Sequence, residues 1–93
     1  MPTYAILFNW TEQGIKNYKD SPGRVEAATK AWEGSEVQIK DIYWTLGAYD
    51  LVGLVDADDD ERLTSALLAL GAAGNVRTTT LRAFGRDEFT RLI

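Results

Sequence analysis

The sequence predicts an α+β fold with a four-stranded antiparallel sheet and two helices. The chain has 93 residues, which is the length of one domain. Hydrophobic residues make up 45% and charged residues 26%, as is ordinary for a globular protein. Strand-like and helix-like segments follow one another in the order β-α-β-β-α-β, which is the ferredoxin-like plan. We therefore expect a single ferredoxin-like domain over residues 1–93.

The first strand is predicted over Thr3–Trp10, where aromatic and branched residues predominate. Thr11 follows as a candidate N-cap for a helix. We expect this helix in two pieces, because Pro22 interrupts it; Ser21 would then cap the second piece. In that piece the spacing of Val25, Ala28, Thr29 and Trp32 predicts one apolar helix face that ends before Gly34.

A β-hairpin is predicted in the middle of the chain. Glu36–Leu46 alternates between apolar and polar residues, but its phase slips near Lys40-Asp41, which predicts a β-bulge there. Gly47-Ala48 makes a tight connection to a third strand over Tyr49–Val55. The continuous apolar run of this strand suggests that both of its faces are covered.

The last part of the chain predicts a helix, a strand and a short closing helix. The acidic run Asp58–Glu61 lies where a helix N-terminus favours negative charge, and leucines follow it at helical spacing. Gly74 and Asn75 end that helix. Val76–Phe84 has the β-branched composition of a fourth strand. Apolar residues at positions 89, 92 and 93 then indicate a short helix.

Both long helices should cover the same face of the sheet, because βαβ crossovers are right-handed. The other face would present roughly 300 Å² to solvent. It is also apolar, and a patch of that size lies at the upper range that monomers tolerate. We therefore expect a homodimer in which two sheets pack face to face.

Composition excludes several classes of protein. The chain has no cysteine and no histidine, which removes disulfides, Cys/His zinc sites, His-based nucleophilic triads and histidine ligation of haem. Its net charge of −4 argues against nucleic acid and against an anionic membrane as partners. The acidic run lacks the glycine and glutamate of a calcium-binding loop, so we expect no metal and no cofactor. No secretory signal is recognisable, and a cytoplasmic protein is expected.

Several motifs agree in order and spacing with one known family, and together they span nearly the whole chain. They are Asn9-Trp10-Thr11-Glu12-Gln13-Gly14-Ile15, Lys19-Asp20-Ser21-Pro22-Gly23-Arg24, Asp41-Ile42-Tyr43-Trp44-Thr45-Leu46-Gly47-Ala48-Tyr49-Asp50-Leu51-Val52 and Gly74-Asn75-Val76-Arg77-Thr78-Thr79-Thr80-Leu81-Arg82-Ala83-Phe84. The chain resembles the GYD-domain family, whose name matches Gly47, Tyr49 and Asp50. The resemblance implies a dimeric α+β barrel and implies no particular activity.

Polar and aromatic residues near the strand ends are the candidate site. A pocket for a flat, mostly apolar ligand would need such residues. The candidate ligand-binding residues are Asn9, Trp10, Trp44, Tyr49 and Asp50. Tyr49 and Asp50 are also candidate catalytic residues, since a phenol can hydrogen-bond a ligand and a desolvated carboxylate can act as a base. The alternative is structural: the aromatics pack in the core or a dimer contact, and Asp50 caps backbone amides or pairs with an arginine.

Three functions stay open at this point. The first is a homodimeric domain that binds a small, flat, mostly apolar ligand in a pocket between the sheet and the helices. The second is an enzyme similar to the cofactor-independent monooxygenases that share the dimeric barrel. The third is a structural or protein-interaction homo-oligomer without a ligand.

Overall fold

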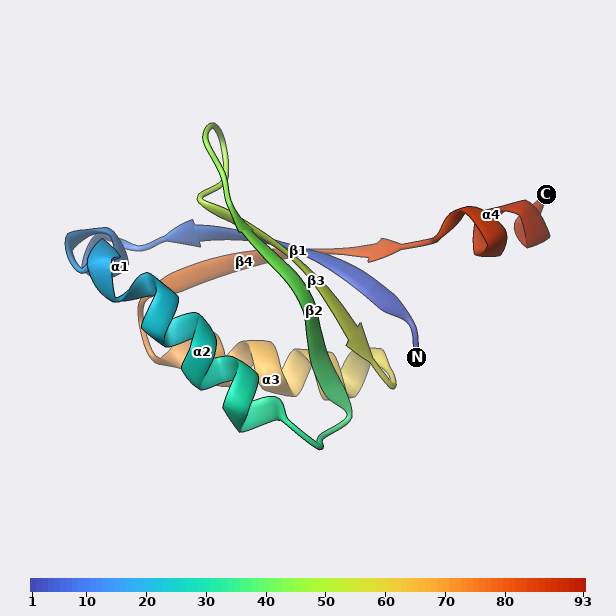
Figure 1. Cartoon of the computed structure of the whole chain (residues 1–93), viewed down its shortest axis with the longest axis horizontal. Coiled ribbons are helices and arrows are strands. Elements are labelled where there is room, and N and C mark those ends of the chain that lie inside the picture. The colour runs from blue at the N-terminus through green and yellow to red at the C-terminus, as the bar shows by residue number, and fades with distance from the viewer.

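The computed structural model describes residues 1–93 and contains four strands, four α-helices and a short 3₁₀ helix (Figure 1). In chain order the elements are β1 (Thr3–Trp10), α1 (Glu12–Lys16), η1 (Tyr18–Asp20), α2 (Ser21–Trp32), β2 (Val37–Trp44), β3 (Leu51–Ala57), α3 (Asp60–Ala72), β4 (Val76–Ala83) and α4 (Arg86–Leu92). The ferredoxin-like element order is confirmed. None of the helices has the length and apolar composition needed to cross a bilayer.

The four strands form one antiparallel sheet in the order β2-β3-β1-β4. The register of β2 against β3 shifts between Ile39 and Asp41, so the predicted bulge is confirmed. This shift brings Ile42 and Trp44 to the same face as Val37. On β3, Ile42 pairs with Gly53, Trp44 with Leu51 and Val37 with Ala57. Helices α2 and α3 both lie on that face of the sheet (Figure 1).

Three details of the sequence prediction are wrong. Ser21 is the first residue of α2 and not its cap, because η1 runs directly into α2 and Ser21 takes helical dihedral angles. Strand β3 begins at Leu51 and not at Tyr49, because the amide of Thr45 donates to the carbonyl of Asp50 and keeps the preceding residues in the hairpin turn. Thr29 is exposed, and its hydroxyl donates to the carbonyl of Val25.

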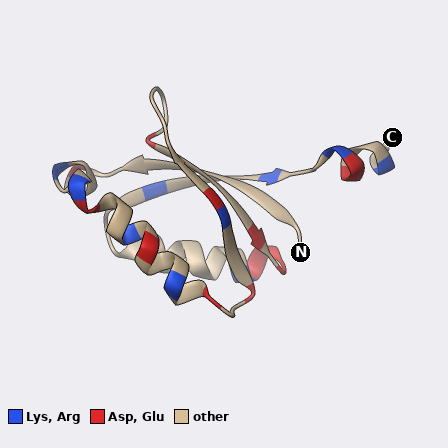
Figure 2. Cartoon of the chain, viewed as in Figure 1, with Lys and Arg blue, Asp and Glu red and all other residues tan.

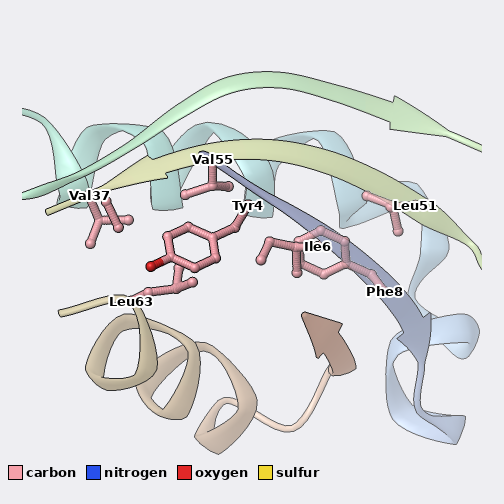
Figure 3. Close-up of a cluster of buried hydrophobic side chains, with 8 residues drawn as sticks. Tyr4, Ile6, Phe8, Val37, Leu51, Val55 and Leu63 are labelled. Carbon is pink, nitrogen blue, oxygen red and sulfur yellow. The ribbon is translucent and has the colours of Figure 1, made fainter. Parts of the chain in front are cut away.

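The core lies between the sheet and the two long helices. Every second residue of β1 points into it, and β3 contributes in the same way (Figure 3). Its buried members are Tyr4, Ile6, Phe8, Val37, Leu51, Val55, Ala57 and Leu63. Burial of these side chains, at about 1.5–3 kcal/mol for each large one, is the main source of stability in the domain.

The opposite face of the sheet, which we call the open face, carries an apolar centre. Cross-strand pairs place Leu7 beside Val52 and Thr79, and Ala5 beside Leu54 and Leu81. β1 contains no charged residue at all (Figure 2). No helix covers this face (Figure 1). The open face is therefore available to a second protein surface.

Residues 84–93, which we call the C-terminal arm, project from the end of β4 away from the rest of the domain (Figure 1). Phe89, Leu92 and Ile93 are 55%, 63% and 91% exposed. The arm is nevertheless oriented at its base, where Glu88 accepts a hydrogen bond from the amide of Gly85 and pairs with Arg82 at 3.3 Å. It therefore presents an apolar helix face with nothing from its own domain beneath it.

Candidate functional site

A groove runs between α2 and α3 over the centre of the sheet. It has a volume of about 380 Å³ and is lined by 20 residues, of which 17 are hydrophobic. α2 packs over β2 at one edge of the sheet, whereas α3 contacts β4 at the other edge as well as β2 and β3. The space between the two helices lies over core residues of the central strands β1 and β3. We call this space the α2–α3 groove.

Small residues on the two facing helices keep the groove open. Its walls include Ala27, Ala28 and Ala31 from α2, and Ala66, Ala69 and Ala73 from α3 and its C-terminal end. Its floor is formed by core residues of the central strands, among them Phe8 and Val55. Alanine side chains are too short to meet across this gap. A volume of this size, lined mostly by apolar side chains, is typical of a small-molecule site.

Three polar residues line the groove, namely Ser21, Arg24 and Asn75. Ser21 and Arg24 lie one helical turn apart on α2, so they share a face of the helix. The Arg24 guanidinium donates to the carbonyls of Gly14 and Asn17, each at 3.3 Å. Gly14 also touches the backbone of Asn75 closely. The three polar residues therefore gather where α1 separates the start of α2 from the start of β4.

The structure brings Trp10 and Asp50 together, as two of the five residues predicted to bind ligand. The carboxylate of Asp50 accepts a hydrogen bond of 2.8 Å from the backbone amide of Trp10, and the amide of Asp50 donates to the carbonyl of Phe8. These bonds tie the β2–β3 turn to the end of β1. The indole Nε1 of Trp10 is buried and has no hydrogen-bond acceptor.

The other three candidates lie near the same end of the sheet without converging on one point. The indole of Trp44 donates to the hydroxyl of Ser21 at 3.0 Å and so joins β2 to α2. Tyr49 contributes its backbone carbonyl, which accepts from Thr45. Asn9 pairs with Arg77 on the open face. None of the five predicted residues lines the α2–α3 groove.

From the sequence we expected a pocket between the sheet and the helices, but we missed the residues that line the groove, because we considered polar and aromatic residues at strand ends. The sequence does carry a signal for this groove. Both long helices are rich in alanine, and these alanines lie on the same helix faces as the larger apolar residues. Alternation of small and large residues on facing helices leaves space between them unless the helices approach closely. No group of three acidic side chains is placed to hold a metal ion.

Two titratable groups have shifted pKa values, and both lie outside the groove. The hydrogen bond to Asp60, followed by burial, raises the pKa of the Tyr4 phenol above its ordinary value. The hydrogen bond from the Gly85 amide, followed by that from Arg82, lowers the pKa of Glu88. Tyr4 lies where β1 contacts α3, and Glu88 lies at the base of the C-terminal arm.

A family model described as the GYD domain matches residues 4–93. Among characterised sequences, a protein of Thermus thermophilus named glutamine synthetase and cystathionine β-lyase binding protein is 33% identical over 84 residues, which are 89% of this chain and 88% of that protein.

Two solved structures share the fold. TTHA0845 from Thermus thermophilus aligns with a TM-score of 0.57 and 31% identity, covering 91% of this chain and 95% of its own. MtbAldR aligns with a TM-score of 0.63 at 22% identity, covering 91% of this chain and 52% of its own. The similarity to MtbAldR shows the fold alone.

Proposed function

This chain belongs to the GYD-domain family, and we propose that it is a homodimeric binding module of the cytoplasm that holds a small, flat, mostly apolar molecule. The observation that carries this proposal is the α2–α3 groove, with 17 hydrophobic residues among the 20 that line it. A ligand that covers exposed apolar walls of this kind removes them from water, which favours binding by about 25 cal/mol per Å² of apolar surface buried. The walls of the groove are two facing helices and its floor is the sheet, an arrangement that suits a planar ligand.

Two apolar surfaces support the homodimer. The open face has an apolar centre that no helix covers, and a second copy could cover it sheet to sheet. The C-terminal arm exposes Phe89, Leu92 and Ile93 on one side of a short helix. Isolated helices of this length are not stable in water without packing. A partner protomer would supply that packing.

Native mass spectrometry of the freshly purified protein tests both parts of the proposal. We expect the mass of a dimer with additional bound mass, and the same ligand released on denaturation. Ala69→Phe would fill the groove and remove the additional mass. Ala72→Phe is the matched control, because Ala72 lies on the same helix and does not line the groove. A dimer without additional mass, and without affinity for planar apolar probes, would refute ligand binding in the groove.

A second candidate function is the binding of other proteins. It is favoured by the 33% identical relative, which is named for binding two enzymes. The exposed apolar side chains of the C-terminal arm offer a surface of the kind that protein interfaces bury. Co-elution of this protein with purified glutamine synthetase or cystathionine β-lyase in size-exclusion chromatography would support this role. The variant Phe89→Ser would then weaken the association, and absence of any complex at micromolar concentrations would exclude both enzymes.

A further inference from the structure

The polar end of the α2–α3 groove has a chemical character that the rest of the groove lacks. Of the residues that line the groove, Ser21, Arg24 and Asn75 are the polar ones, and no aspartate or glutamate is among them. Arg24 takes part in none of the salt bridges of the molecule. The only formal charge on the groove wall is therefore positive.

Hydrogen-bond donors at this end outnumber the acceptors that they reach. The guanidinium of Arg24 has five N–H groups, and its two bonds to backbone carbonyls are long at 3.3 Å. The Asn75 side chain uses its oxygen to accept from Gln13 at 2.9 Å, and its Nδ2 donates to no protein group. The buried hydroxyl of Ser21 accepts from Trp44, and its own hydrogen has no protein acceptor. Each of the three polar residues that line the groove therefore keeps at least one donor without a protein acceptor.

The start of α2 adds little to this potential. The amide of Ser21 already donates to the carbonyl of Tyr18, and Pro22 has no N–H group. Asp20 at the N-cap position carries a negative charge, and it is not part of the groove lining. Within the groove, Arg24 is therefore the group that would stabilise the anionic end of a ligand.

We propose that the α2–α3 groove takes an apolar molecule that ends in a single carboxylate, with the carboxylate at Arg24 and the apolar body between the two helices. This inference rests on the proposed ligand-binding function and specifies its ligand class. A guanidinium binds a carboxylate through two parallel N–H···O bonds, which fixes the orientation of the ligand. The amide of Asn75 and the hydroxyl of Ser21 would donate to the remaining lone pairs. Planar aromatic acids and short fatty acids both have this chemistry.

A matched pair of probes tests the proposal. 2-Naphthoate and 2-naphthamide have the same planar apolar body, and only the first is charged at neutral pH. Isothermal titration calorimetry should give naphthoate an affinity about tenfold above that of the amide, as a charge-assisted hydrogen bond predicts. In Arg24→Gln the affinity for naphthoate should fall to that for the amide. The amide should bind Arg24→Gln as it binds the wild type, which shows that the groove is intact.

Arg62→Gln is the control for net charge, because Arg62 lies on α3 and does not line the groove. It should keep the tenfold preference for naphthoate. Equal binding of the two probes to the wild type would overturn the carboxylate proposal and leave the apolar groove as a ligand site. Binding of neither probe would overturn the ligand-binding function itself, and the carboxylate proposal with it. A preference that survives Arg24→Gln would move the anion site elsewhere and overturn the role of Arg24.

Discussion

At Gly14 the absence of a side chain is required by packing. A Cβ atom at this position would lie 2.0 Å from the carbonyl oxygen of Asn75, which accepts a hydrogen bond from the amide of Thr11. Backbone cannot yield as a flexible side chain can, so Gly14→Ala should lower the free energy of unfolding by about 1–3 kcal/mol. Gly23→Ala is the control, because a Cβ there meets no atom within 4 Å. It should stabilise α2 by up to about 1 kcal/mol. Urea denaturation measures the free energy of unfolding of both variants. Equal changes in Gly14→Ala and Gly23→Ala would contradict the requirement for glycine at position 14.

Asp50, the last residue of the Gly-Tyr-Asp motif, has a structural task in the β2–β3 turn. Its carboxylate accepts from the Trp10 amide at 2.8 Å, and hydrogen bonds to charged groups contribute about 1.5–3 kcal/mol. Asp50→Ala should lower the melting temperature, and Asp50→Asn should lower it less, because an amide oxygen can still accept. Affinity for ligands in the groove should not change. Affinity lost at an unchanged melting temperature would instead assign Asp50 to the ligand site. Asp58→Asn, at an exposed position, should change neither property.

At the scale of elements, β1 and α3 are joined by the buried Tyr4, whose hydroxyl donates to the carboxylate of Asp60 in the first turn of the helix. That bond, together with burial, raises the pKa of Tyr4 above its ordinary value of about 10. The folded protein therefore holds this proton more tightly than the unfolded chain does. The stabilisation is complete below pH ~10 and is lost as the pH rises from there through the folded-state pKa.

This pH dependence can be measured by urea denaturation between pH 7 and pH 11. The wild type should be more stable than Tyr4→Phe at pH 7, because the variant lacks the hydrogen bond to Asp60. The difference should shrink above pH ~10. Tyr18→Phe should give a pH dependence like that of the wild type, because Tyr18 is exposed. A difference between wild type and Tyr4→Phe that is constant over this range would show that the phenol proton does not matter to folding.

Elements were predictable from the sequence where their cause is local. The slipped alternation near Lys40-Asp41 predicted the bulge, and the run Asp58–Glu61 predicted the start of α3, where Asp59 caps the amide of Arg62. The capping of α1 by Thr11 is also confirmed. A pocket between the sheet and the helices was expected, but the residues that line the α2–α3 groove and the gathering of Arg24 with Asn75 were not predictable, because both depend on the distance between elements far apart in the chain. Ser21 looked like a cap since the sequence does not show that η1 continues into α2.

At the scale of the whole molecule, the proposed dimer needs more surface than the sheet offers. Four strands of seven or eight residues present about 500 Å², whereas stable interfaces bury about 800 Å² on each partner. The exposed Phe89, Leu92 and Ile93 of the C-terminal arm could supply the difference across the dimer. Phe89→Ser should therefore raise the dimer dissociation constant without lowering the stability of the monomer. Analytical ultracentrifugation over a range of concentrations measures this, and an unchanged constant would place the arm outside the interface.

The sheet itself should contribute the larger part of the proposed dimer interface, and neighbouring residues of β4 allow a matched test. Leu81 lies on the open face beside Ala5, and Thr80 lies on the opposite face beside Ile6. Both residues are exposed in the single protomer, so neither substitution should prevent folding. Leu81→Lys would leave a desolvated charge between two sheets and should convert the dimer into a folded monomer. Thr80→Lys adds the same charge outside that interface and should leave the dimer intact. Dissociation by both variants to the same extent, or a wild-type protein that is monomeric at micromolar concentrations, would show that the open face does not hold two copies together.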